Sequence, residues 1–97
     1  MKTVDTQLVV ERAKTHGDYY DVAKYTALFK EVLDNAEGDR FESKLPPLTD
    51  TQRLSLDMIM NKVARILAGQ SSLQEHWKDI SGYAYIAHKE KGVPYAD

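Results

Sequence analysis

The stretch from Thr49 to Gly69 constrains the fold of this chain most strongly. Thr49 is followed three residues later by Gln52, which is a capping-box pattern, and Leu48 stands at the hydrophobic-staple position. Apolar residues then cover nearly the whole circumference of a predicted helix at 50–68 that ends at Gly69. A helix that is apolar on almost every side is buried, either centrally in a domain or between subunits.

Glycine and proline divide the rest of the sequence into three further segments with helical patterns. Their apolar spacing predicts helices at about 6–14, 19–35 and 73–90, with a long loop at 36–48. No stretch alternates with the period of a strand, so no sheet is expected. The sequence therefore predicts an all-α fold, a four-helix bundle-like single domain. Because a chain of 97 residues buries a modest core, we expect oligomerisation to complete the bundle.

Local residues indicate where two of these helices begin. Gly17 suits a left-handed turn, and Asp18 suits the N-cap of the helix that follows. Ser72 with Glu75 repeats the capping-box pattern before the last helix. Gly82 lies inside that helix, where glycine costs about 1 kcal/mol relative to alanine. Its presence favours close approach of a neighbouring helix or of a ligand.

Composition excludes several classes of function. The 13 Lys and Arg residues nearly balance the 15 Asp and Glu residues, so no basic face for nucleic acid is expected. No apolar run is long enough to span a membrane, and the N-terminal segment lacks the apolar core of a signal peptide. The absence of cysteine excludes disulfides, thiolate metal sites and cysteine nucleophiles. We therefore expect a cytoplasmic protein that binds neither nucleic acid nor membranes.

A line of polar residues runs along the otherwise apolar helix at 50–68. Asp57, Asn61 and Arg65 lie at i, i+4 and i+8 on one side, with Lys62 beside them. Because the burial of unpaired charges is costly, this line must face solvent, an ion-pair partner or a ligand. An exposed ladder of side-chain pairs is one interpretation, and a ligand site is the other.

Acidic residues of the last helix offer a counterpart to this line. Glu75 and Asp79 lie at i and i+4 on one side of that helix. If the last two helices are antiparallel, Asp57 and Asp79 converge on one pocket. Carboxylates from facing helices are ligands for Mg²⁺, and Lys62 and Arg65 would then contact phosphate oxygens. This pattern predicts a magnesium and phosphate site between the two helices.

A second polar cluster precedes the helix at 19–35. Arg12, His16 and Asp18 lie at the predicted helix break. The backbone N–H groups at the start of the next helix are suited to receive an anion there. The three histidines of the chain share no metal-ligand spacing, so a zinc site is not expected.

Three ordered blocks carry a family resemblance. They are R-x-x-T-H-G-D at 12–18, D-x-x-x-x-K-x-x-R at 57–65 and H-W-x-D-x-x-G-Y at 76–83. The pattern resembles a family of small phage and prophage proteins of unknown function. That family in turn distantly resembles the phage nucleotide-modification-associated domain and the MazG-type all-α nucleotide pyrophosphohydrolases.

The resemblance implies a phage-encoded helical protein that handles nucleotides in the host cytoplasm, as a dimer or higher oligomer. MazG-type enzymes bind Mg²⁺ through an E-x-x-E pair on one helix and an E-x-x-D pair on the next. They cleave a nucleoside triphosphate to a monophosphate and pyrophosphate. The corresponding pairs here are Asp57 with Asn61 and Glu75 with Asp79, at i, i+4 spacing. Because Asn61 is neutral, this set holds Mg²⁺ less strongly than four carboxylates.

The first hypothesis is Mg²⁺-dependent hydrolysis of a nucleoside triphosphate or a related phosphate anhydride. In this hypothesis Asp57 and Asp79 are catalytic, and both bind Mg²⁺ together with Glu75. The expected substrate-binding residues are Arg12, His16, Asp18, Lys62, Arg65 and Tyr83.

Two alternatives keep the fold and change the function. In the first, the chain binds a nucleotide or cyclic nucleotide without chemistry, as a sequestering counter-defence protein. The incomplete carboxylate set favours this alternative. In the second, the chain is a helical adaptor that binds a host protein through an apolar face, which the apolar helix at 50–68 permits.

Overall fold

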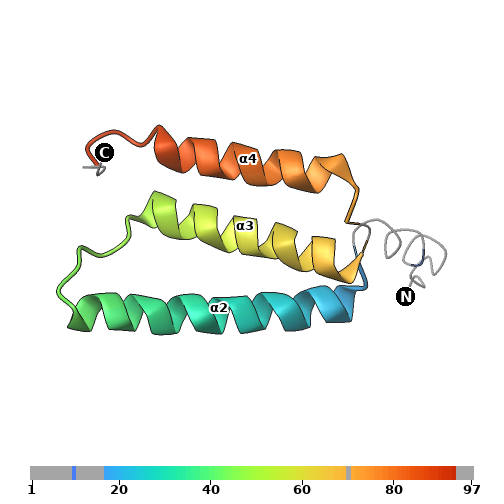
Figure 1. The fold of residues 1–97 in the computed structure, drawn as a ribbon, viewed down its shortest axis with the longest axis horizontal. Coiled ribbons are helices and arrows are strands. Elements are labelled where there is room, and N and C mark those ends of the chain that lie inside the picture. Colours follow the sequence, from blue (N-terminus) through green and yellow to red (C-terminus); the bar gives the residue numbers. More distant parts are fainter. Residues whose placement is uncertain (1–9, 11–16, 70, 94–97) are drawn as a thin grey trace, which may run out of the picture.

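The described part of the chain is all-α. The computed structural model describes residue 10, residues 17–69 and residues 71–93, and these contain no strand. They form three helices: α2 (Tyr19–Glu42), α3 (Asp50–Ala68) and α4 (Gln74–His88), shown in Figure 1. The helix predicted at 6–14 lies outside the described residues except for Val10, so the four-helix arrangement stays a prediction.

α2 begins where the sequence predicts and ends later. The Asp18 side chain accepts hydrogen bonds from the backbone N–H groups of Tyr20, at 2.9 Å, and Asp21, at 3.3 Å, after Gly17 turns at a φ of 87°. The predicted loop start at 36 is wrong, because the helix continues to Glu42. Gly38 weakens this extension locally. Contacts to α3 and to the following loop, made by side chains of the last turns, offset that cost.

α3 has the bounds that the capping signals predict. The backbone N–H of Gln52 donates to Thr49 Oγ1 at 3.1 Å, and the N–H of Thr49 donates to Gln52 Oε1 at 3.0 Å. The Thr49 hydroxyl also donates to Glu90 Oε2 at 2.7 Å, which ties the start of α3 to the segment just after α4. Both the local cap and this contact therefore fix the start of α3.

α4 differs from prediction at both ends. Its N-cap residue is Leu73 rather than Ser72, and the helix ends at His88 rather than near residue 90. The indole N–H of Trp77 donates to the carbonyl oxygen of Ser71 at 2.7 Å. This bond reaches back from the first turns of α4 to the preceding turn, and the helix begins one residue later than the capping pattern indicates.

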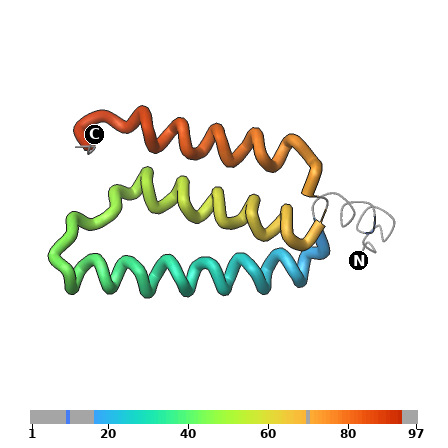
Figure 2. The backbone as a smooth tube through the Cα atoms, in the orientation of Figure 1, coloured from blue at the N-terminus to red at the C-terminus, as the bar shows by residue number. Residues whose placement is uncertain are grey.

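The three helices form one layer with α3 in the middle. Consecutive helices run antiparallel: in Figure 2, α2 runs from right to left, α3 returns from left to right between the other two helices, and α4 runs from right to left. The radius of gyration is 16.4 Å. A compact chain of this length has a radius of about 12.5 Å. None of the described helices is long and apolar enough to cross a membrane.

Little apolar surface is buried within this layer. Among the described residues the buried apolar side chains are Val22, Ala64 and Ile66. Gly17, just before α2, lies close to the end of α3, because a Cβ atom there would lie 2.8 Å from the Cβ of Ala68. The layer therefore leaves two broad sides of α3 without a covering element of the described chain.

Candidate functional site

An ion pair joins α3 to α4 at two of the predicted site residues. Lys62 Nζ lies 3.0 Å from Asp79 Oδ2. The Lys62 side chain is 17% exposed and the Asp79 side chain 35%, so the pair lies in the contact between the helices. Lys62 has three N–H donors, and one of them faces Asp79. The remaining donors are available to a further acceptor such as a phosphate oxygen.

A second polar contact lies on the side of α3 that faces α2. Arg65 Nε donates to Asn61 Oδ1 at 3.0 Å, one turn apart on the same helix. The Asn61 amide nitrogen then approaches Thr26 Oγ1 of α2 at 3.5 Å. The Arg65 to Asn61 step of the predicted ladder is therefore present. Thr26 was not predicted, because nothing local in the sequence relates it to a residue 35 positions away.

A cluster of four charged side chains, which we call the Arg53 cluster, joins α2 to α3 further along. The guanidinium of Arg53 lies 2.8 Å from Asp34 Oδ1 and 3.1 Å from Asp57 Oδ1, and it also pairs with Glu37. The carboxylates of Glu37 and Asp34 raise the pKa of Arg53 above its ordinary value. One cation thus serves three carboxylates from two helices.

Sequence reasoning missed three members of the Arg53 cluster. The missed residues are Asp34, Glu37 and Arg53. Two signals are present in the sequence: Asp34 and Glu37 stand at i, i+3, and Arg53 precedes Asp57 at i, i+4. The predicted end of the first helix at residue 35 separated Glu37 from Asp34 and concealed their common side.

The two carboxylates predicted to be catalytic make their ion pairs on different sides of α3. Asp57 faces α2 through Arg53, whereas Asp79 faces α3 from α4 through Lys62. Asp57 and Lys62 are five residues apart, which places them about 140° apart around the helix. The geometry therefore does not bring Asp57 and Asp79 together. In residues 17–69 and 71–93, no group of three His, Asp or Glu side chains is arranged to hold a metal ion.

The remaining predicted residues fall into three groups. Arg12 and His16 lie outside the described residues. Asp18 caps α2 and is exposed, and Glu75 is exposed in the first turn of α4. Tyr83 is half-buried on α4, about one helical turn after Asp79.

Gly82 does not mark a close approach between helices of the described chain. A Cβ atom built on it would meet nothing within 4 Å. The predicted packing reason for this glycine is therefore wrong for these helices, since α3 lies against a different side of α4. The close approach of a ligand to Gly82 stays a prediction.

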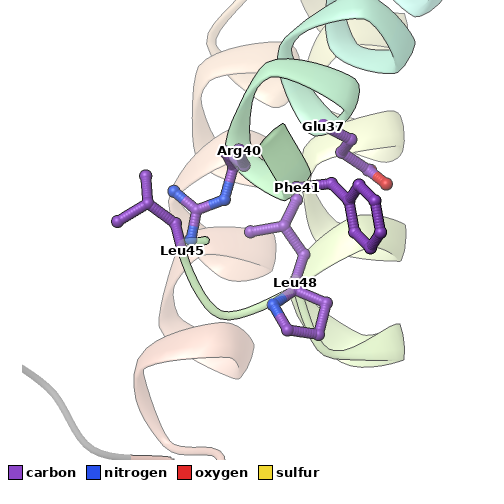
Figure 3. Close-up of a pocket in the computed structure, with 6 residues that line it drawn as sticks. Glu37, Arg40, Phe41, Leu45 and Leu48 are labelled. Carbon is purple, nitrogen blue, oxygen red and sulfur yellow. The ribbon is translucent and has the colours of Figure 1, made fainter. Parts of the chain in front are cut away.

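An open pocket lies at the end of α2, and Glu37 of the Arg53 cluster is one of its lining residues. Figure 3 shows it at the end of α2, where the chain turns toward α3. Its volume is about 390 Å³, and Arg40 beside it donates from Nη2 to the carbonyl oxygen of Pro46 at 2.8 Å. It is lined by Glu37, Arg40, Phe41, Leu45, Pro47 and Leu48. None of the site residues predicted from the sequence lines this pocket.

Comparison of the chain with family models, with curated proteins and with solved structures gives no match. The phage-family resemblance thus stays an expectation drawn from the three sequence blocks. The contacts of Lys62, Arg65 and Asp79 are the geometric basis for a functional proposal.

Proposed function

We propose that this chain binds a phosphate-containing small molecule, a nucleotide in the first instance, through Lys62 and Arg65. The observation that carries the proposal is that both cations are half-buried, three residues apart on α3, and held by polar partners. Ammonium and guanidinium groups are the side chains that bind phosphate most strongly. Oriented, partly desolvated cations bind an anion at lower entropic cost than freely rotating surface lysines.

Binding without hydrolysis is the form of this proposal that the contacts favour. Asp57 and Asp79 each already neutralise a cation, Arg53 and Lys62 respectively. Mg²⁺ requires several oxygen ligands in near-octahedral geometry, so recruitment of these carboxylates would first break both ion pairs. Sequestration of a nucleotide or cyclic nucleotide is therefore our first proposal, with a phage counter-defence role as its context. Mg²⁺-dependent hydrolysis is the second.

A ³¹P NMR experiment separates these two forms. Stoichiometric protein is added, with Mg²⁺, to nucleoside triphosphates, monophosphates and cyclic dinucleotides. Sequestration predicts shifted or broadened resonances of one ligand class without product. New pyrophosphate or monophosphate signals would instead establish hydrolysis. A spectrum that protein leaves unchanged contradicts both.

Substitutions at the Lys62–Asp79 ion pair have different expected effects under sequestration and under hydrolysis. Lys62→Gln should weaken ligand binding about 10-fold or more, because one charge-assisted hydrogen bond is lost. Asp79→Asn should leave binding unchanged or tighten it, because the amide oxygen still accepts from Lys62 and keeps it oriented while the competing negative charge is removed. If Asp79 instead holds Mg²⁺, the same substitution abolishes turnover. Lys24→Gln, at an exposed position of α2, is the control for net charge.

A homo-oligomer is the state in which we propose that the chain acts. Large apolar side chains lie exposed on all three helices, which supports association of the layer with another surface. The exposed large apolar residues on the helices are Tyr19, Tyr20, Leu28, Val32, Phe41, Leu54, Leu67, Trp77, Tyr85 and Ile86. The same observation supports the adaptor function as a second candidate, with a host protein in place of a second copy.

Sedimentation velocity of the purified chain tests this part of the proposal. A mass above 11.0 kDa without added partner supports the homo-oligomer. A monomer at every concentration leaves the adaptor as the account of the exposed apolar surface.

A further inference from the structure

One side of α3 lies between α2 and α4, and part of the proposed ligand site belongs to it. Asn61 marks its edge toward α2, and Lys62 marks its edge toward α4. These neighbouring residues point about 100° apart around the helix. By the same rotation per residue, three residues of α3 project between the two edges and within about 40° of one another. They are Leu54, Met58 and Arg65, and we call this surface the open side of α3.

Tyr83 of α4 borders the open side of α3 at the level of Met58. The two helices are antiparallel, and Lys62 contacts Asp79 across them (Figure 1). Met58 lies about one turn before Lys62. Tyr83 lies about one turn after Asp79, which is the same direction in space because the chain direction reverses between the helices. Both side chains are half-buried, so each keeps a surface that a ligand can contact.

The apolar surface continues one turn further in the same direction. Leu54 of α3 is 62% exposed, and Ile86 of α4 is 55% exposed. Ile86 lies about 20° from Asp79 around α4, so it borders the same side of the layer as the ion pair does. Exposed apolar side chains that adjoin one another on two helices are typical of a binding surface.

The open side of α3 is therefore cationic at one end and apolar at the other. Arg65, with Lys62 at the edge, lies about 10 Å along the helix axis from Met58. Asp57 lies about 60° to one side of the apolar end, and its carboxylate is engaged by Arg53. A ligand that uses both ends carries an anionic group and an apolar or aromatic group about 10 Å or less apart. A nucleoside monophosphate has this form, because one ribose separates its phosphate from its base.

We infer that the base of the nucleotide stacks on the Tyr83 ring and contacts the Met58 thioether, while Lys62 and Arg65 hold its phosphate. The inference rests on the phosphate-binding part of the proposed function and adds the recognition of the base. Aromatic side chains stack on the face that every base presents, and a methionine sulfur makes favourable contacts with aromatic rings. The site should therefore select a nucleotide over a sugar phosphate and discriminate weakly between bases.

AMP and ribose 5-phosphate form a matched pair of probes, because they share the ribose and the phosphate and differ by the adenine base. Isothermal titration calorimetry should show that AMP binds about 10-fold or more tightly than ribose 5-phosphate. Tyr83→Leu should remove most of this preference by weakening the binding of AMP, because it deletes the stacking face and keeps an apolar side chain. Tyr83→Phe should preserve the preference, because the ring remains.

Tyr85→Leu is the control for the loss of an aromatic residue from α4. Tyr85 is 57% exposed, lies about 160° from Tyr83 around the helix and has the Lys89 ammonium 5.5 Å from the centre of its ring. Its substitution should leave the binding of both probes unchanged. Circular dichroism verifies that each variant keeps the helix content of the wild type.

The two probes separate failure of the base contact from failure of the phosphate site. If AMP and ribose 5-phosphate bind equally well, the base contact is overturned and the phosphate site stands. A preference for AMP that Tyr83→Leu leaves intact, or that Tyr85→Leu removes, places the base elsewhere and also overturns the inferred contact. Failure of both probes to bind at millimolar concentration overturns the phosphate site together with the inference.

Proton NMR of the ligand gives a second measurement that reports on stacking itself. The adenine H2 and H8 resonances of AMP should move upfield on binding, because the ring current of Tyr83 shields protons above its face. The shift should persist with Tyr83→Phe and disappear with Tyr83→Leu. An equal shift with all three side chains at this position contradicts stacking on Tyr83.

Discussion

Arg53 joins α2 to α3 through ion pairs with carboxylates of both helices. Its guanidinium pairs with Asp34, Glu37 and Asp57 at once. Arg53→Met should lower the thermal unfolding midpoint, because three carboxylates then face one another without a cation. The loss should shrink in 1 M NaCl, where the Debye length is about 3 Å and their repulsion is screened. Thermal unfolding at low and high salt measures both effects.

The control for this prediction is a cation outside the Arg53 cluster. Lys24→Met removes one positive charge from an exposed position of α2 and should leave the midpoint nearly unchanged. If Arg53→Met and Lys24→Met behave alike at both salt concentrations, the Arg53 cluster does not stabilise the fold.

Whether a contact can be predicted from the sequence depends on how far apart its two residues lie along the chain. The caps at Asp18 and Thr49 were predicted, because each accepts from a backbone N–H two or three residues away. The ion pair of Lys62 with Asp79 was reached only as a shared pocket, since it needs the antiparallel placement of two helices. Arg53 was missed because two of its partners lie 16 and 19 residues earlier on another helix.

At the scale of the element, a glycine inside α2 tests why this helix is longer than its local pattern indicates. Gly38 has helical backbone geometry, and a Cβ atom there would meet nothing within 4 Å. Gly38→Ala should therefore raise the free energy of unfolding by about 1 kcal/mol, because alanine loses less backbone entropy than glycine in a helix. Urea unfolding followed by circular dichroism measures the change.

A matched substitution on a non-helical glycine controls for the entropy of the unfolded chain. Gly92 also has open space around it, but its φ of 83° is one that alanine adopts with strain. Gly92→Ala should lower stability or leave it unchanged. A loss of stability in Gly38→Ala would show that the last turns of α2 are not helical in solution.

Element boundaries were predictable where a local cap sets them and unpredictable where contacts between helices do. α3 has a capping box at its start and Gly69 at its end, and both bounds agree with the sequence. The last turns of α2 contain Gly38 and few apolar residues, so no local signal favours a helix there. Contacts of Glu37 with α3 and of Arg40 with Pro46 extend the helix through them.

At the scale of the molecule, the all-α class was predictable, but the layer was not. Helical spacing shows that each segment has an apolar side, and it does not show which sides meet. In the structure α3 uses two opposite sides for α2 and α4, so no element of the described residues covers its two remaining sides. One of these sides contains Arg65 of the proposed ligand site, together with the exposed Leu54.

If the proposed homo-oligomer completes the open layer, the chain must be less stable when it is diluted. For a dimer that unfolds to separate chains, the free energy of unfolding rises with protein concentration, by about 1.4 kcal/mol per dimer for each tenfold increase. The unfolding entropy of two chains of this length converts this into a rise in Tm of about 3–4 °C per tenfold. Differential scanning calorimetry from micromolar to hundreds of micromolar chain measures the slope. A Tm that does not change with concentration contradicts coupling between folding and assembly.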